Sequence, residues 1–328
     1  MRSVLPLNLT DKQQSYHGSH STCGGSDEDN FSQAELFNEQ FFKVTFLSNP
    51  DSTAHAIFIL NFLISIVGIV GNGCVIWLLG FCIERNNFTI YVLNLAIADL
   101  GMLISALAFN VPFITILKVA DVQKIQWVFW QCSLFTYSVG LYLVTAIGIE
   151  RCLCILFPIW ARCHRPKHLS ITVSVTSWIV SALFCITEFL LHYFCLLDLW
   201  FTSIRIMFSV NLFILTPVMV VSTLILFIKM SFRHQPGKLH TIILIILIFF
   251  VITAIPYGTF FFMSTINYNF HSIAVPVFSL LVILNSSINS IIYFFVGIQC
   301  NCKSCESIKV VFQRIFKDET EHAETIMT

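Results

Sequence analysis

Long apolar runs, separated by short polar or charged breaks, fill the chain from residue 54 onward. A helix needs about 20 predominantly apolar residues to cross the hydrocarbon core of a bilayer. Seven runs meet that length, at residues 54–82, 88–117, 125–156, 169–191, 206–229, 239–265 and 273–298. The break between the last two rests on Asn267, Asn269 and His271, but without it one run would be about twice as long as a bilayer crossing. The pattern therefore predicts an all-α membrane protein, a seven-transmembrane helix bundle.

Composition supports a membrane protein and narrows its partners. The 328 residues are 56% hydrophobic and 11% charged, whereas soluble domains carry about 25% charged residues. No Asp, Glu, Lys or Arg occurs between Leu239 and Cys302. The formal net charge of +0 argues against nucleic acid as a partner, because binding to a polyanion depends on basic surfaces.

The distribution of basic residues predicts the orientation. An odd number of spans places the two ends of the chain on opposite sides, and cytoplasmic loops carry an excess of Lys and Arg. With the N-terminus outside, two thirds of the 18 Lys and Arg residues lie on the inner side. We therefore expect an extracellular N-terminal tail at 1–53, a membrane domain at 54–298 and a cytoplasmic tail at 299–328.

The N-terminal tail is polar and rich in Ser, Asn and Asp. It lacks the apolar segment of a cleavable signal peptide, and its composition predicts disorder. Asn8 and Asn30 begin Asn-x-Ser/Thr sequons, which would face the outside and accept glycans in this orientation. Two further matches, at Asn87 and Asn285, fall in an inner loop and within a span, where we expect no glycan.

The cytoplasmic tail predicts a short amphipathic helix at 302–317. Five apolar residues recur there at helical spacing: Ile308, Val311, Phe312, Ile315 and Phe316. One face of the helix can therefore enter the inner leaflet, while its basic residues contact anionic lipid headgroups. Cys300, Cys302 and Cys305 could hold a metal, but their position directly after the last span favours palmitoylation.

Few polar groups interrupt the spans, and those that do share one depth. Asp99 is the acid near the middle of the second span, and Asn72 lies at mid-depth in the first. The seventh span adds Asn285, Ser286 and Asn289, and the two Asn residues, one helical turn apart, share a face. An acid among amides and hydroxyls can hold a small cation or a proton, or it can serve only to fix helix packing.

Ordered motifs along residues 54–317 give the pattern a family resemblance. Asn72, "LNLAIAD" in the second span, "ERC" at the inner end of the third, Trp178, Pro217, Pro256 and "NSSINSIIY" follow one another. Together they resemble the rhodopsin-like (class A) G-protein-coupled receptors. The segments "GLYLVTAIGIERCLCILFPIWARCHRPKH" and "NSSINSIIYFFVG" are similar to the Mas-related receptors, which have Glu-Arg-Cys where most class A receptors have Asp-Arg-Tyr.

The resemblance implies a multi-pass receptor at the plasma membrane. Such a receptor binds an extracellular peptide or small charged molecule and activates a heterotrimeric G protein, of the Gq or Gi type. It places Arg151 beneath the G protein, held back at rest, with Glu150 next to it and Pro158 at the start of the basic loop. Arg151 can bend toward its neighbour or snorkel to water. The alternative is that Glu150 and Arg151 only anchor the helix at the interface.

The resemblance also implies a switch network inside the bundle. Its residues are Asn72, Asp99, Phe250, Pro256, Asn285, Ser286, Asn289 and Tyr293. We expect Tyr293 to move toward the G protein on activation. Gly140 stands where a Ser often helps to hold sodium, so Asp99 is a candidate for a weak sodium site only. Ser290 stands where Pro normally kinks the seventh span.

Other positions depart from the family pattern near the outer face. Gln126 occupies the place of a Cys that many receptors bond to the second outer loop. Cys185 and Cys195 lie near that loop and Cys23 lies in the tail, so the disulfide connectivity stays open. Ala254 replaces a Trp that usually lies under the ligand, which implies a shallower pocket.

Glu188 lies about 15 Å outward from Trp178, at 1.5 Å per residue, and so near the outer mouth. Some Mas-related receptors that respond to basic peptides and amines use an acid at the matching position, with a second acid early in the fifth span. Here that region offers Arg205, and Asp198 lies earlier in the loop, so a ligand with both charges suits Glu188 and Arg205. The alternative is a protonated Glu188, or a Glu188–Arg205 pair that only joins two helices. Ser133 stands where biogenic-amine receptors have Asp.

Catalysis and transport fit the sequence less well. His164 and His168 have the i, i+4 spacing of a zinc pair on a helix, but Pro166 between them disfavours a helix. The chain contains no Gly-x-Ser-x-Gly elbow, Walker loop or His-Glu-x-x-His motif, so we expect no enzyme activity and no cofactor. A transporter or channel would predict internal repeats and opposed acids at mid-membrane, and the sequence shows neither.

Overall fold

The computed structural model describes residues 52–82, 86–115, 120–166, 168–194, 196–232, 238–264 and 274–299. Within them, seven helices are long and apolar enough to cross a membrane, so the predicted seven-span bundle is confirmed. The N-terminal tail and the segment 302–317 lie outside the described residues. So do the predicted modification sites Asn8, Asn30, Cys300, Cys302 and Cys305.

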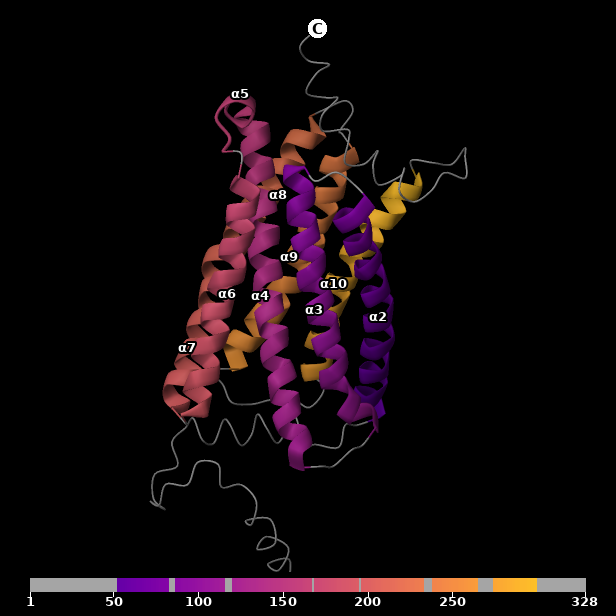
Figure 1. The fold of residues 1–328 in the computed structure, drawn as a ribbon, viewed down its shortest axis with the longest axis vertical. Helices are drawn as coiled ribbons and strands as arrows, with labels where there is room; N and C mark the ends of the chain where they lie inside the picture. Colours follow the sequence, from indigo (N-terminus) through magenta and orange to yellow (C-terminus); the bar gives the residue numbers. More distant parts are fainter. Residues whose placement is uncertain are drawn as a thin grey trace, which may run out of the picture.

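Nine α-helices and two π-helical turns make up the described chain. The helices are α2 (Ser52–Trp77), α3 (Asn87–Thr115), α4 (Ala120–Leu156), α5 (Pro158–Cys163), α6 (Leu169–Tyr193), α7 (Leu197–Val210), α8 (Thr216–Ser231), α9 (Lys238–Ser264) and α10 (Ala274–Gln299). The π-helical turn η3 (Leu78–Cys82) extends α2, and η4 (Asn211–Leu215) joins α7 to α8. Figure 1 shows α3 and α4 in the middle of the bundle and α5 at the end opposite the start of α7; α4 packs against α3, α6, α8 and α9.

The fifth span begins earlier than the hydrophobic pattern predicts. We expected 206–229, whereas α7 begins at Leu197 and the span covers Asp198–Lys229. Four buried apolar residues explain the extra turns: Trp200, Phe201, Ile204 and Phe208. Their stripe is hidden in an average over residues that includes Asp198 and Arg205. Asp198 therefore lies in the first turn of α7 and not in a loop, where the helix dipole favours an acid.

Local rules account for the second inner loop. α5 begins at Pro158, a residue favoured at the first helical position because its backbone has no N–H to satisfy. Arg165 precedes Pro166, which disfavours helical backbone at Arg165, and neither residue belongs to a helix. His164 and His168 fall between α5 and α6, so the prediction that they do not share a helix is confirmed.

Polar side chains face the interior of the bundle and apolar side chains face outward. The buried residues of α6 are Ser170, Ser174, Ser177, Ser181 and Glu188. Val175, Ile179 and Leu183, on its opposite face, are 50–60% exposed and would contact lipid. Because the bilayer core offers no water, polar atoms must find partners inside the protein, and the small Ser side chains let α6 pack closely on α3 and α4.

Small residues also bring α2 close to α10. A Cβ added at Gly68 would collide with the Ser287 side chain and lie 2.7 Å from a methyl carbon of Leu103. The Ser287 hydroxyl donates to the Ile64 carbonyl oxygen over 3.4 Å, which joins the two helices directly. Ser290, in the place of the expected Pro, donates to the Ser287 carbonyl oxygen over 2.9 Å, and α10 is one uninterrupted helix.

Replacing Gly68 by Ala should therefore lower the melting temperature of the purified protein in detergent. Overpacking a tight contact typically costs about 1–3 kcal/mol, and here Ser287 and Leu103 would both have to move. Gly73→Ala is the matched control on the same helix, because a Cβ at Gly73 would meet nothing within 4 Å. Equal melting temperatures for the two variants would contradict the close approach of α2 and α10.

Candidate functional sites

The polar residues that share one depth in the sequence meet in the structure. The Asn289 amide donates to Asp99 Oδ2 over 2.8 Å, and the Ser286 side chain lies within hydrogen-bond reach of the same carboxyl. The Asn72 amide donates to the Ser286 carbonyl oxygen over 3.0 Å. All four residues are at most 4% exposed. One buried polar cluster therefore joins α2, α3 and α10.

Thr253 extends this cluster to α9. Its Oγ1 lies 3.1 Å from Asn285 Oδ1 and 3.1 Å from the carbonyl oxygen of Phe250. Phe250 is buried, and Pro256, which lies inside α9, removes one backbone hydrogen bond from that helix. Sequence reasoning missed Thr253, whose signal is a single hydroxyl between Phe250 and Pro256. Tyr293 belongs to α10, but its side chain lies outside the described residues.

The surroundings of Asp99 give a poor donor set for sodium. The Asn289 amide nitrogen, a donor, already contacts one carboxyl oxygen. Gly140 adds no oxygen, and a Cβ there would lie 3.8 Å from a methyl carbon of Leu95. In the described part of the chain, no group of three or more His, Cys, Asp or Glu could hold a metal ion. We therefore assign no signalling step to a bound cation.

At the inner end of α4, the two charges of the Glu-Arg-Cys motif have different partners. Arg165 donates from Nε and Nη2 to Glu150 Oε1, over 3.1 and 2.7 Å. Arg151 is 6% exposed, and its guanidinium carbon lies 4.4 Å from the ring centre of Phe88 on α3, within cation–π range. Arg151 thus neither bends to Glu150 nor snorkels to water, the two arrangements expected from the sequence, because Arg165 holds Glu150 and Phe88 holds Arg151.

Sequence reasoning missed the part that Arg165 plays here. Its Nη2 also donates to the Ser170 hydroxyl over 2.6 Å, and the Tyr91 hydroxyl of α3 lies next to both Glu150 and Ser170. The available signal was one basic residue placed directly before Pro166 in the loop. Its partners lie on three helices, and no local pattern identifies them.

At the outer half of the bundle, Glu188 lies on the buried face of α6 and is 1% exposed. Its Oε1 has no hydrogen-bond partner among the described residues. The Gln131 side chain of α4 lies close to it, but neither amide atom of Gln131 has a well-formed hydrogen bond in the same part of the chain. Glu188 forms no ion pair with any described residue, so a structural Glu188–Arg205 pair is not the arrangement observed.

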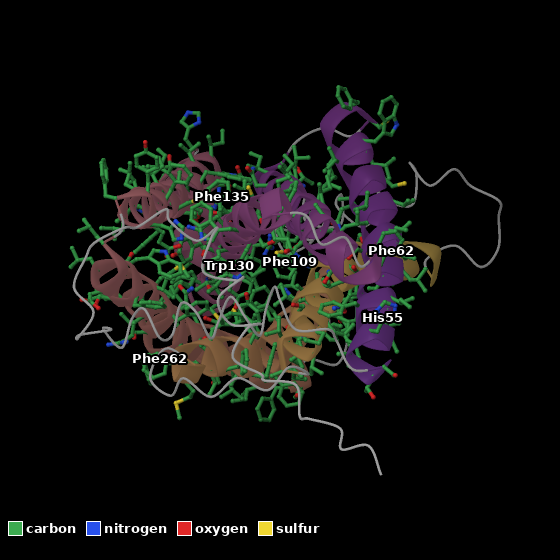
Figure 2. All side chains as sticks on the ribbon, turned by 90° about the horizontal axis from the view of Figure 1, so that it is seen from below. His55, Phe62, Phe109, Trp130, Phe135 and Phe262 are labelled. Carbon is green, nitrogen blue, oxygen red and sulfur yellow. The ribbon has the colours of Figure 1, made fainter. Side chains whose placement is uncertain are left out.

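An aromatic layer lies one helical turn outward from this pair. Trp127 of α4 stacks on His192 of α6 with ring centres 4.3 Å apart. Trp200 of α7 meets the edge of His192 at 5.3 Å and of Trp130 at 6.4 Å. Figure 2 looks at this outer end and shows Trp130 near the middle of the bundle, with His55 on α2 at its rim. Sequence reasoning missed this layer, which joins α4, α6 and α7 just above Glu188.

A second aromatic cluster fills the interior where a deep ligand would otherwise lie. Tyr257 of α9 lies 4.8 Å from Tyr137 of α4 and 4.8 Å from Phe261, between ring centres. Phe208 of α7 stacks on Phe261 at 5.3 Å. Ala254, in place of the usual Trp, is buried on the same helix. These contacts agree with the shallower pocket that Ala254 led us to expect.

The position of the missing disulfide has a different tie. The Gln126 amide donates to the Phe109 carbonyl oxygen over 3.3 Å, which joins the outer ends of α4 and α3. Cys185 is a free thiol in the structure, whereas Cys195 and Cys23 lie outside the described residues.

Seven spans that enclose a polar cluster, between an outer acid and an inner arginine, define a signalling receptor of the membrane rather than a pore. The family model of the 7 transmembrane receptor (rhodopsin family) matches residues 71–293. The chain therefore belongs to the rhodopsin family of G-protein-coupled receptors and, within it, to the Mas-related receptors. Such proteins are cell-surface receptors that span the membrane several times and have ligands and G proteins as partners, and they are generally not enzymes.

The relatives agree with the resemblance seen in the motifs. The chain is 35% identical to "Proto-oncogene Mas" of Rattus norvegicus over 277 residues, which cover 79% of this chain and 82% of that protein. It is 35% identical to "Mas-related G-protein coupled receptor member D" of Macaca fascicularis over 275 residues, 77% of this chain and 82% of that protein. It is 34% identical to "Mas-related G-protein coupled receptor member X1" of Homo sapiens over 278 residues, with 80% and 84% covered.

Asp99→Asn should alter signalling without removing the receptor from the cell surface. Asn retains the size of the side chain and can still meet Asn289, but it cannot carry the charge of the carboxyl. We expect agonist-free activity, or potency toward any active compound from a panel of basic peptides and amines, to change at least threefold. Asp198→Asn is the control, because Asp198 is an exposed acid in the first turn of α7. Unchanged activity at normal surface level would leave the cluster with a packing role only.

Proposed function

We propose that this receptor recognises an extracellular peptide or small molecule with a positively charged group, through Glu188. We propose that it then activates a heterotrimeric G protein of the Gq or Gi type through Arg151, with the N-terminus outside the cell. The observation that carries the ligand class is the Glu188 carboxyl. It is 1% exposed, and no described residue hydrogen-bonds its Oε1.

An uncompensated carboxylate inside a protein is costly, because burial removes its hydration. The Gln131 amide beside Glu188 can donate a hydrogen bond, but it cannot neutralise a charge. A ligand ammonium or guanidinium would supply both the donors and the charge, and such charge-assisted hydrogen bonds are stronger than neutral ones. The Glu188 carboxyl is best explained as one half of an ion pair whose other half arrives with the ligand.

Arg205 extends the proposal to ligands that carry an acid as well. It is half-buried on α7, the helix that packs against α6. A molecule with a positive and a negative group could therefore contact Glu188 and Arg205 together. The aromatic layer of Trp127, His192 and Trp200 lies above Glu188 and offers apolar and cation–π contacts at the mouth.

The alternative is a neutral Glu188 that only packs α6 against α4. A protonated carboxyl can donate a hydrogen bond to a neighbouring oxygen such as that of Gln131, and it needs no cation. Gln at position 188 would preserve both the shape and the hydrogen bonding of that neutral group. Substitution by Gln therefore separates a carboxyl that recognises a ligand from one that fills space.

The inner end offers a surface for the G protein. Phe157, just before α5, is 57% exposed, and Ile159 within it is 76% exposed. Pro158 fixes the start of this short helix, and exposed apolar groups of this kind suit contact with a protein partner. In the proposal, Arg151 leaves Phe88 and packs under the G protein, while Tyr293 swings toward it.

The two tails complete the proposal. We propose glycans on Asn8 and Asn30, and palmitate on one or more of Cys300, Cys302 and Cys305. The support is the orientation predicted by the basic residues and the amphipathic pattern at 302–317. An acylated cysteine next to an amphipathic basic helix supplies two membrane signals, which is what stable anchoring requires.

Glu188→Gln should lower the potency of a cationic agonist at least tenfold. Losing one partner of a desolvated charge pair typically costs about 2–5 kcal/mol. The measurement is a calcium and cAMP dose–response, with any active basic peptide or amine, at matched surface expression. Asp198→Asn is the control acid, and its potency should stay within twofold. Equal potency in Glu188→Gln would assign the residue to packing.

Arg151→Ala should reduce nucleotide exchange on purified heterotrimer at least tenfold. The substitution removes the guanidinium and leaves Phe88, so the loss would report the charge rather than the ring it packs on. Lys229→Ala is the control, because Lys229 is an exposed basic residue in the last turn of α8. Full exchange by Arg151→Ala would mean that this charge only anchors α4 at the interface.

A further inference from the structure

Arg165 connects three segments at the inner end of the bundle. Its Nε and Nη2 donate to Glu150 Oε1 over 3.1 and 2.7 Å, and its Nη2 also donates to the Ser170 hydroxyl over 2.6 Å. Glu150 belongs to α4 and Ser170 to α6, whereas Arg165 lies between α5 and α6. One side chain therefore ties the second inner loop to two spans.

This contact is a buried ion pair. The side chains of Arg165 and Glu150 are only 9% and 10% exposed, so water screens their attraction weakly. Pro166 disfavours helical backbone at Arg165, which limits the positions that the guanidinium can take. The Tyr91 hydroxyl beside Glu150 and Ser170 completes a polar surrounding. The Glu150 carboxylate is thus held by the loop.

Arg151, the next residue along α4, points elsewhere. Successive side chains on a helix are about 100° apart, so Glu150 faces Arg165 and Ser170 while Arg151 lies over the Phe88 ring. A long Arg side chain can nevertheless bend toward a neighbouring carboxylate, because its stem is flexible. Arg165 and Arg151 are therefore competitors for the same carboxylate, and in this structure Arg165 holds it.

We propose that Arg165 is a positioning residue for G-protein activation: it holds Glu150 and so leaves Arg151 available to the G protein. This inference rests on the proposed role of Arg151. Removing Arg165 releases the Glu150 carboxylate, which then pairs with Arg151 and withdraws it from the G-protein site. Removing both Arg165 and the charge of Glu150 leaves nothing to capture Arg151.

The test compares four purified variants in lipid nanodiscs with the wild-type receptor: Arg165→Gln, Arg165→Lys, Glu150→Gln and the double variant Glu150→Gln/Arg165→Gln. The readout is the apparent affinity for nucleotide-free Gq and Gi heterotrimers. Arg165→Gln should weaken it at least fivefold. Arg165→Lys keeps the positive charge and should stay within twofold, as should Glu150→Gln and the double variant. His168→Gln, in the same loop, is the control, because His168 makes no side-chain hydrogen bond at the start of α6.

Recovery in the double variant is the decisive result. A role of Arg165 confined to loop structure, or a direct contact with the G protein, predicts that the double variant is as weak as Arg165→Gln. That outcome overturns the proposal, and so does an Arg165→Gln variant with wild-type affinity. Hydrogen exchange of the segment 157–166 should rise in both the single and the double variant, which shows that the loop is loosened equally in the two.

A melting-temperature cycle without G protein separates this inference from the proposed function. In the wild-type background, Glu150 should couple energetically to Arg165 and not to Arg151. In the Arg165→Gln background, Glu150→Gln and Arg151→Ala should become non-additive, because the released carboxylate now pairs with Arg151. If this cycle holds but wild-type receptor binds neither heterotrimer, the proposed coupling fails and the competition for Glu150 stands. Additive melting temperatures in that background overturn the competition itself.

Discussion

The absence of water from the bilayer core is the constraint on which the rest of this structure depends. Every polar group inside the spans has to find its partner within the protein. The Asp99 carboxyl therefore meets the Asn289 amide, and the Trp178 indole donates to Asn94 Oδ1 over 3.0 Å. Helix faces without such groups turn outward toward lipid. The inward faces are held by specific contacts of polar and small residues, and these define how the helices pack.

Against this background, the two ends of the bundle differ in a way that suits a receptor. At the outer half, Glu188 and Gln131 are buried with hydrogen-bonding capacity that the described residues leave unused. At the inner end, Glu150 is satisfied by Arg165, and Arg151 rests on Phe88. An unused acid can accept a ligand, and an arginine held only by an aromatic ring can change partner. The fully bonded cluster around Asp99 lies between these two ends.

Departures from the common family pattern each come with a local replacement. Ala254 lacks the bulk of a Trp, and the cluster around Tyr257 fills the interior on the same helix. Gln126 cannot form a disulfide, but its hydrogen bond to the Phe109 carbonyl holds α4 to α3. Ser290 retains the backbone N–H that Pro would lack, and its hydroxyl bonds within α10. The fold tolerates these changes because each contact, not each residue type, is what the packing requires.

The sequence by itself determined the seven spans, the family and the shared depth of Asn72, Asp99, Asn285 and Asn289. These follow from local properties, because lipid selects apolar runs of a fixed length and makes each polar interruption conspicuous. The tertiary structure alone decided which groups meet: Thr253 with Asn285, Trp127 with His192, and Arg165 with Glu150. It also moved the start of the fifth span to Leu197. Such choices depend on which faces of distant helices oppose each other, and that geometry is absent from any single stretch of the chain.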